Sequence, residues 1–168
     1  MEAPPDRRVY EDMLARYLPA LRRLAWSYTR HGQAEAEDLV QEIAMALWTA
    51  LPRFRGESNE RTWLYRVAHN TAISFVTMRV RRANHEAPPA NIESRSDAAS
   101  PEGEAIESQR RARLQTAVAA LPVPDRQLVL LYLEGLSARE IEDVTGLSAG
   151  NVATRLTRAR QKLKEAVS

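Results

Sequence analysis

The stretch DRQLVLLYLEGLSAREIEDVTGLSAGNVATRLTRARQKL, residues 125–163, carries the clearest structural signals in this chain. It opens with a helix that Asp125 can cap and that ends at a glycine ten residues later. Ser137 and Glu140 then form the S-x-x-E pattern of a capping box, which predicts a short helix over residues 138–144.

A glycine turn and another helix follow the capping box. Gly146 can supply the tight turn, and Ser148 can cap the last helix. Two helices joined by a short turn that contains glycine form the helix-turn-helix pattern. The sequence therefore predicts this motif at the C-terminal end of the chain.

The surface chemistry of the last helix indicates what the motif binds. Four apolar residues recur at helical spacing and should pack inward: Val152, Leu156, Ala159 and Leu163. The other faces carry polar and cationic groups, namely Gly150, Asn151, Thr154, Arg155, Thr157, Arg158 and Gln161. In a DNA major groove such side chains pair with base edges and hold phosphates. A merely solvated basic helix end is the alternative, and it accounts for Lys162 and Lys164 but not for the polar N-terminal half.

Upstream, three apolar stripes at helical spacing predict an all-helical first domain over residues 8–82. Strand-like alternation is absent. The stripes comprise Leu14, Leu18, Leu21, Ala25 and Tyr28, then Leu39, Ile43, Ala46 and Ala50, then Leu64, Ala68, Thr71, Phe75 and Met78.

Residues 83–108 differ in composition from the segments on either side. They contain three prolines, several serines and few large apolar groups, so they cannot repay the entropy of ordering and are expected to form a flexible linker. The helical pattern then continues through a second domain, residues 109–168. The predicted fold class is all-α, with two small helical domains joined by a flexible linker.

Bulk composition restricts the class of protein further. The net charge of +2 says little about the partners of the protein, so the distribution of charge along the chain must be examined instead. The chain has no cysteine, which excludes disulfides and cysteine-based metal sites. No apolar run reaches the ~20 residues of a membrane span, and we expect a soluble, cytoplasmic protein without membrane insertion.

The third predicted helix and the loop before it form a second candidate surface for nucleic acid. Residues 61–82 contain no acid, and helical geometry places one aromatic, several polar and two cationic side chains along one line: Trp63, Arg66, Asn70, Ser74, Thr77 and Arg81. Ser58 and Asn59 in the preceding loop can form a pocket wall. Such a surface can stack bases and hold the backbone of an unpaired strand, although Trp63 could instead be a core anchor.

The second predicted helix, AEDLVQEIAMALW (residues 36–48), is acidic. Glu35, Asp38 and Glu42 flank its apolar stripe, with Gln41 nearby. This surface repels DNA and suits a protein partner with basic residues. Stabilisation of the helix dipole by acids at the N-terminus is the alternative, and it does not explain Glu42.

Taken together, these segments resemble the extracytoplasmic-function (ECF) sigma factors, the minimal two-domain members of the sigma-70 family of bacterial RNA polymerase. Residues 36–48 resemble the polymerase-docking helix of region 2, and FRGESNERTWLYRVAHNTAISFVTMRVRR (54–82) resembles the part that reads the minus-10 element. Residues 121–163 resemble region 4, which reads the minus-35 element. The resemblance covers residues 10–167 apart from the linker.

The resemblance implies a role for each candidate site. Polymerase docking is expected at Glu35, Asp38, Leu39, Gln41 and Glu42. Contacts to the melted minus-10 element are expected at Ser58, Asn59, Trp63, Arg66, Asn70, Ser74, Thr77 and Arg81. Contacts to the double-stranded minus-35 element are expected at Ser148, Gly150, Asn151, Thr154, Arg155 and Arg158. It further implies core RNA polymerase and promoter DNA as partners, regulation by an anti-sigma factor, and neither a catalytic residue, a cofactor nor a metal.

Three positions depart from the usual pattern of the family. Ser74 replaces a common Asp or Asn, Glu142 a common Ala, and Asn151 a common Thr. The departures at Ser74 and Asn151 leave the preferred minus-10 and minus-35 sequences open.

Two other classes of function remain as alternatives. A stand-alone helix-turn-helix regulator would use the same last helix as a dimer but would leave the acidic helix without a role. A small helical enzyme would have to rely on His31, His69 and His85, which show neither ligand spacing nor a nucleophile motif.

Overall fold

The computed structural model describes residues 5–29, 32–84 and 104–167 of the 168-residue chain. Within these ranges the chain forms α-helices and one short 3-10 helix, and no strand. The elements are α1 (Arg7–Tyr28), α2 (Gln33–Ala50), η1 (Leu51–Arg53), α3 (Glu60–Ala83), α4 (Glu104–Ala120), α5 (Val123–Leu133), α6 (Ala138–Thr145) and α7 (Ala149–Val167). The predicted all-α fold class is confirmed.

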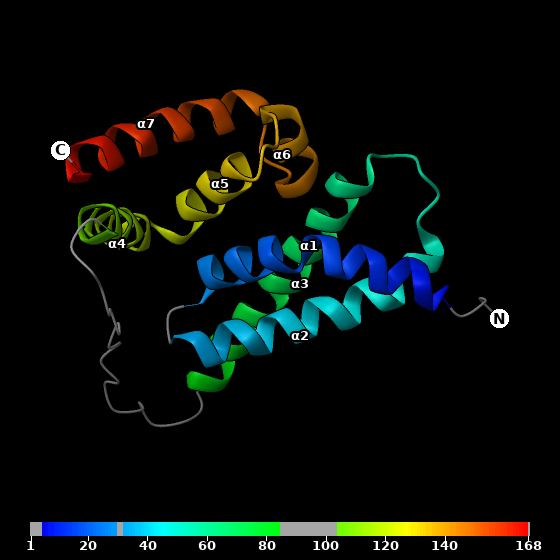
Figure 1. Cartoon of the computed structure of the whole chain (residues 1–168). Coiled ribbons are helices and arrows are strands. Elements are labelled where there is room, and N and C mark those ends of the chain that lie inside the picture. Colours follow the sequence, from blue (N-terminus) through cyan, green and yellow to red (C-terminus); the bar gives the residue numbers. More distant parts are fainter. Residues whose placement is uncertain (1–4, 30–31, 85–103, 168) are drawn as a thin grey trace.

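The helices form two modules that lie against each other (Figure 1). In the first module, α2 packs against both α1 and α3; in the second, α7 packs against α4, α5 and α6. Between the modules, α1 contacts α5 and α3 contacts α6. Residues 85–103, which make up most of the predicted linker, lie outside the described residues.

The three predicted stripes supply most of the core of the first module. Leu21, Leu39, Ile43 and Leu64 are completely buried. The prediction for Met78 was wrong, since 56% of its surface is exposed. From residue 73 onward most side chains of α3 are exposed, so this end of the helix has little packed against it.

A buried polar pair joins α1 to α3 in this core. The Tyr28 hydroxyl and Nδ1 of His69 share a hydrogen bond, and the two residues are only 2% and 9% exposed. Burial lowers the pKa of His69 and raises that of Tyr28, because both charged forms lose water there. His69 is therefore a packed structural residue, while His31 and His85 lie outside the described residues.

The capping box of the second module is confirmed. The backbone N–H of Ser137 donates to Oε2 of Glu140 at 2.7 Å, and the N–H of Glu140 donates to Oγ of Ser137 at 3.2 Å. Gly146 ends α6 with a φ of 76°, a conformation that favours glycine. The N–H of Asn151 donates to Oγ of Ser148 at 3.3 Å, so Ser148 caps α7 as predicted.

Two predicted boundaries differ from the structure. Helix α5 begins at Val123, with Pro122 as its N-cap and Pro124 in its first turn, where proline is tolerated. Asp125 is therefore inside the helix and does not cap it. Helix α4 begins at Glu104, inside the predicted linker. Its first residues include good helix formers such as alanine and glutamate.

The central part of helix α5 is buried on all of its faces. Six consecutive residues, from Arg126 to Leu131, are buried. More than one neighbour must therefore cover the helix, and it contacts α6 and α7 in its own module and α1 in the other. The packing of α5 thus requires both modules.

Replacing His69 with Gln should weaken the pH dependence of stability. In the unfolded chain this residue binds a proton near pH 6.5, whereas burial keeps its pKa lower in the folded protein. As the pH falls below about 6.5, the unfolded state gains protons and the native protein loses up to about 1.4 kcal/mol per pH unit from this group. Urea unfolding at pH 7.5, 6.5 and 5.5 measures the difference. Parallel losses in the two proteins would exclude His69 as the responsible group.

Candidate nucleic-acid interface

Helix α7 has the two faces that the sequence predicts. Val152, Leu156 and Ala159 are buried, and Leu163 packs against the same core. The exposed face contains six of the polar or small residues named above: Gly150, Asn151, Thr154, Thr157, Arg158 and Gln161. The helix therefore presents amide, hydroxyl and guanidinium groups to a ligand, as direct readout of base edges requires.

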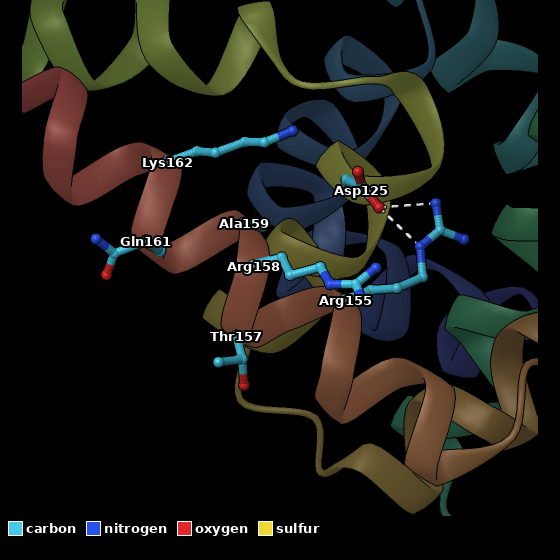
Figure 2. Close-up of a pocket in the computed structure, with 7 residues that line it drawn as sticks. All are labelled: Asp125, Arg155, Thr157, Arg158, Ala159, Gln161 and Lys162. Atoms are coloured by element: carbon cyan, nitrogen blue, oxygen red, sulfur yellow. Dashed lines mark hydrogen bonds and ion pairs between the residues drawn. The ribbon is translucent and has the colours of Figure 1, made fainter.

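Arg155 does not belong to this exposed set, because it is partly buried. Its Nε donates to Oδ1 of Asp125 at 2.8 Å, and a terminal nitrogen lies 2.7 Å from the same oxygen. Only 28% of the arginine side chain and 20% of the aspartate side chain are exposed. Figure 2 shows Arg155 reaching back to α5, so this guanidinium ties α7 to its neighbour.

A cationic hollow of about 720 Å³ lies between α5 and α7 beside this ion pair. Arg155, Arg158 and Lys162 line it together with one acid, Asp125. An excess of cations over acids suits the phosphates of a DNA backbone. Lys162 was not among the predicted contacts, because in the sequence it resembles an ordinary basic helix end.

On α3, the loop before the helix is fixed to the helix itself. The side chain of Asn59 accepts a hydrogen bond from the N–H of Arg61, which caps α3, and a terminal nitrogen of Arg66 donates to Oγ of Ser58 at 3.4 Å. The Trp63 ring is half-buried and packs against Phe54, with ring centroids 4.8 Å apart. Trp63 is thus partly an anchor, as the alternative interpretation held, yet it stays accessible.

These contacts surround a second hollow, of about 590 Å³, which could receive a base. Of the two residues predicted to form a pocket wall, Ser58 lines this hollow and Asn59 does not. Trp63 and Arg66 of the predicted surface also line it, together with residues that the sequence did not single out: Pro52, Arg53, Phe54, Arg55 and Glu57. Farther along α3, Asn70, Ser74, Thr77 and Arg81 are all exposed. The structure therefore places the predicted minus-10 residues on one continuous surface of the loop and helix.

On α2, the structure divides the predicted docking residues. Asp38, Gln41 and Glu42 are exposed. Leu39 is fully buried, and Glu35 is 8% exposed with its carboxylate 3.0 Å from Nε of Arg79. Both are corrections, since neither side chain is available to a partner in this arrangement.

An exposed methionine completes the α2 surface. Met45 is 65% exposed, and it follows Gln41 by four residues and Glu42 by three, so all three share one face. Glu42 and Met45 line a shallow hollow of about 490 Å³ together with Val67, Asn70 and Thr71 of α3. The sequence analysis missed Met45. Its helical spacing from Gln41 and Glu42 was the available signal, but a methionine with alanines on either side is more readily interpreted as a core residue.

Together, the cationic helix-turn-helix and the aromatic hollow on the first module are the features of a two-module DNA-binding protein. None of the helices within residues 5–29, 32–84 and 104–167 is long and apolar enough to cross a membrane. The same residues contain no cluster of histidines and carboxylates able to hold a metal ion.

Comparison with known proteins identifies both modules. The family model for sigma-70 region 2 matches residues 13–82, and that for sigma-70 region 4 matches residues 111–163. The RNA polymerase sigma-H factor of Pseudomonas aeruginosa is 34% identical, with 96% of this chain and 88% of the relative covered. The ECF RNA polymerase sigma-E factor of Escherichia coli K12 is 30% identical over the same shares.

A solved structure shares the fold across both modules. The sigma factor RpoE in complex with the anti-sigma factor NepR, from Bartonella quintana, matches with a TM-score of 0.72 and 24% identity, covering 95% of this chain and 97% of the other. The chain belongs to the extracytoplasmic-function sigma factors of the sigma-70 family. As such it binds core RNA polymerase and directs promoter-specific initiation of transcription.

The pair between Asp125 and Arg155 should stabilise the second module measurably. Replacing Asp125 with Ala should lower the free energy of unfolding by about 1 kcal/mol, since the pair is only partly screened by water. The same replacement should cost much less when Arg155 is already Ala. Urea unfolding of the two single variants and the double variant measures this coupling, with the exposed Asp143→Ala as control. Strictly additive losses would contradict an energetic link.

Proposed function

We propose that this sigma factor divides promoter recognition between its modules. Residues 8–82 dock on core polymerase and read the minus-10 element, and residues 109–168 read the minus-35 element, with the start of α4 extending the second module to residue 104. The exposed polar and cationic face of α7 behind a capped turn is the observation that carries this division. The same observation favours DNA binding by α7 over the alternative of a merely solvated basic helix end.

For the minus-35 element, the exposed residues of α7 lie in the major groove. Asn151, Thr154 and Arg158 contact base edges, and Gly150 allows the backbone to approach closely because no side chain intervenes. Ser148 fixes the start of the helix. Arg155, held by Asp125, acts on the DNA backbone with its remaining nitrogen.

For the minus-10 element, the hollow beside Trp63 receives an unstacked base of the melted strand. Flipping a base out of the duplex costs a few kcal/mol, and stacking on an aromatic ring restores about 1–3 kcal/mol per base. Ser58 forms part of the wall, Asn59 fixes the start of α3 as its N-cap, and Arg66 and Arg81 hold the backbone. Asn70, Ser74 and Thr77 supply the polar contacts along the helix.

For the polymerase, the docking surface is the exposed part of α2, namely Asp38, Gln41 and Glu42, extended by Met45. The carboxylates orient the partner and accelerate encounter, while the methionine supplies adaptable apolar contact. Leu39 and Glu35 support this surface from below. Glu35 does so through its pair with Arg79.

The protein acts in the cytoplasm, has no catalytic step of its own and is restrained by an anti-sigma factor. Support comes from the solved structure of RpoE, which is bound to the anti-sigma factor NepR. The sigma-factor relatives support the absence of catalysis, since the polymerase carries out nucleotide transfer.

Replacing Arg158 with Ala should weaken transcription that depends on the minus-35 element by roughly 5- to 150-fold, the range for a lost base contact of about 1–3 kcal/mol. Binding to core polymerase should stay unchanged. Run-off transcription on a promoter library, with Arg113→Ala on the exposed part of α4 as a matched control, measures the effect. Loss of core binding in the Arg158 variant would contradict the division of labour.

Reversing the charge at Asp38 or Glu42 should weaken assembly with core polymerase and leave binding of minus-35 DNA intact. A lysine there repels the basic groups that the acidic surface is expected to meet, which should slow association most strongly at low salt. Surface plasmon resonance with immobilised core polymerase gives the association rate. Asp12→Lys on α1 introduces the same charge change at another exposed site, and equal slowing by it would refute a specific docking surface.

A further inference from the structure

One acid on α6 contacts the start of α7. Glu142, which replaces an alanine common in the family, is exposed. Its Oε2 accepts a hydrogen bond from the backbone N–H of Ala149, the first residue of α7, at 3.1 Å. The contact spans the turn that contains Gly146, where the two helices meet (Figure 1). The carboxylate of α6 therefore lies at the N-terminal tip of α7.

The position of Glu142 within α6 does not explain why an acid is present there. The residue lies in the second half of this eight-residue helix, and its carbonyl accepts the N–H of Gly146, which ends the helix. A negative charge is disfavoured at a helix C-terminus and favoured at a helix N-terminus. Glu142 is therefore stabilised by its contact with α7 and not by the helix that carries it.

These contacts close the N-terminal tip of α7 to phosphate. Backbone N–H groups at the start of a helix form a ready site for a phosphate. Here the N–H of Ala149 donates to Glu142, and the N–H of Asn151 donates to Oγ of Ser148 at 3.3 Å. A phosphate at this tip would also be repelled by the nearby carboxylate. When α7 lies in the major groove, its tip must therefore face base edges and not the DNA backbone.

The four bases differ in what they offer to a carboxylate. An ionised carboxylate only accepts hydrogen bonds. In the major groove, cytosine presents its N4 amino group as a donor, whereas guanine and thymine present acceptors, and adenine combines a donor with the N7 acceptor. Cytosine is therefore the best partner for a glutamate. In the part of the chain that the structure describes, no group donates to the other oxygen of Glu142, Oε1, so that oxygen can receive the amino group.

We propose that Glu142 is a specificity-determining residue of minus-35 recognition, which accepts a hydrogen bond from the N4 amino group of a cytosine and disfavours guanine and thymine at that position. This inference rests on the proposed placement of α7 in the major groove. Arginine pairs best with guanine and asparagine with adenine, so Arg158 and Asn151 cannot supply this preference. Ala149 holds the carboxylate in place before DNA binds, which lowers the entropic cost of the contact.

The experiment compares the base preferences of holoenzymes. Core polymerase with the wild-type chain or with Glu142→Gln is incubated with promoters randomised in the minus-35 element, and the templates in initiation complexes are sequenced. We expect the wild type to enrich cytosine over guanine at one position by roughly fivefold or more, the lower end for a good base contact. Glu142→Gln should lose this enrichment, because an amide replaces one acceptor oxygen by a donor. Its remaining oxygen can still cap Ala149.

Two further variants separate base recognition from capping and from charge. Glu142→Ala removes the acceptor altogether and should also lose the cytosine preference. Asp143→Asn is the matched control, since Asp143 is the next residue on α6, is likewise exposed and loses the same charge. A lost negative charge acts on the phosphates of every sequence alike, so this control should leave all base preferences unchanged.

The outcomes distinguish the inference from the proposed function. Unchanged base preferences in Glu142→Gln and Glu142→Ala, or binding weakened equally for all sequences, would overturn the inference and leave Glu142 as a helix cap only. The same change of preference in Asp143→Asn would also overturn it. Arg158→Ala on the same library tests the placement of α7 without involving Glu142. If Arg158→Ala left minus-35 recognition intact, the proposed function would fail, and the inference with it.

Discussion

The burial of α5 on all sides is the constraint on which the rest of the structure depends. A helix whose residues 126–131 are all buried cannot lie at the surface of a small four-helix module, because some of those faces would meet water. Helices α6 and α7 cover it within the second module, and α1 covers it from the first. Because α5 contacts both α7 and α1, the position of α7 is linked to the first module, although α7 and α1 lie far apart in the sequence.

Apolar packing and polar contacts have different roles where the modules meet. Burial of leucines supplies most of the favourable free energy, but it is not directional. The guanidinium contacts determine the register, because each donor must meet its acceptor within about 3 Å. Arg23 pairs with Glu134 and Arg61 pairs with Glu140 across the modules, and because both pairs are partly exposed to water each contributes on the order of 1 kcal/mol.

Local sequence signals predicted the elements well and their partners poorly. The capping box of Ser137 and Glu140 and the turn at Gly146 involve residues within a few positions of one another, so the sequence contains all that is needed to predict them. Asp125 is 30 residues from Arg155, and Arg23 is 111 residues from Glu134. No periodicity encodes such pairs. For the same reason, the burial of Glu35 against Arg79 could not be predicted from an acidic helix alone.

Pairing of arginines within the protein also reduces the entropy that the exposed surfaces lose when they bind a ligand. Long side chains lose rotamer entropy when a ligand fixes them, at a cost of about 0.5–1.5 kcal/mol each. Arg155 and Arg66 are already held, by Asp125 and Ser58, so binding orders them further at little cost. Arg158 is exposed and keeps its freedom to adapt. This combination suits the DNA contacts proposed above, because fixed cations can keep their register on a DNA backbone while adaptable cations adjust to the bases.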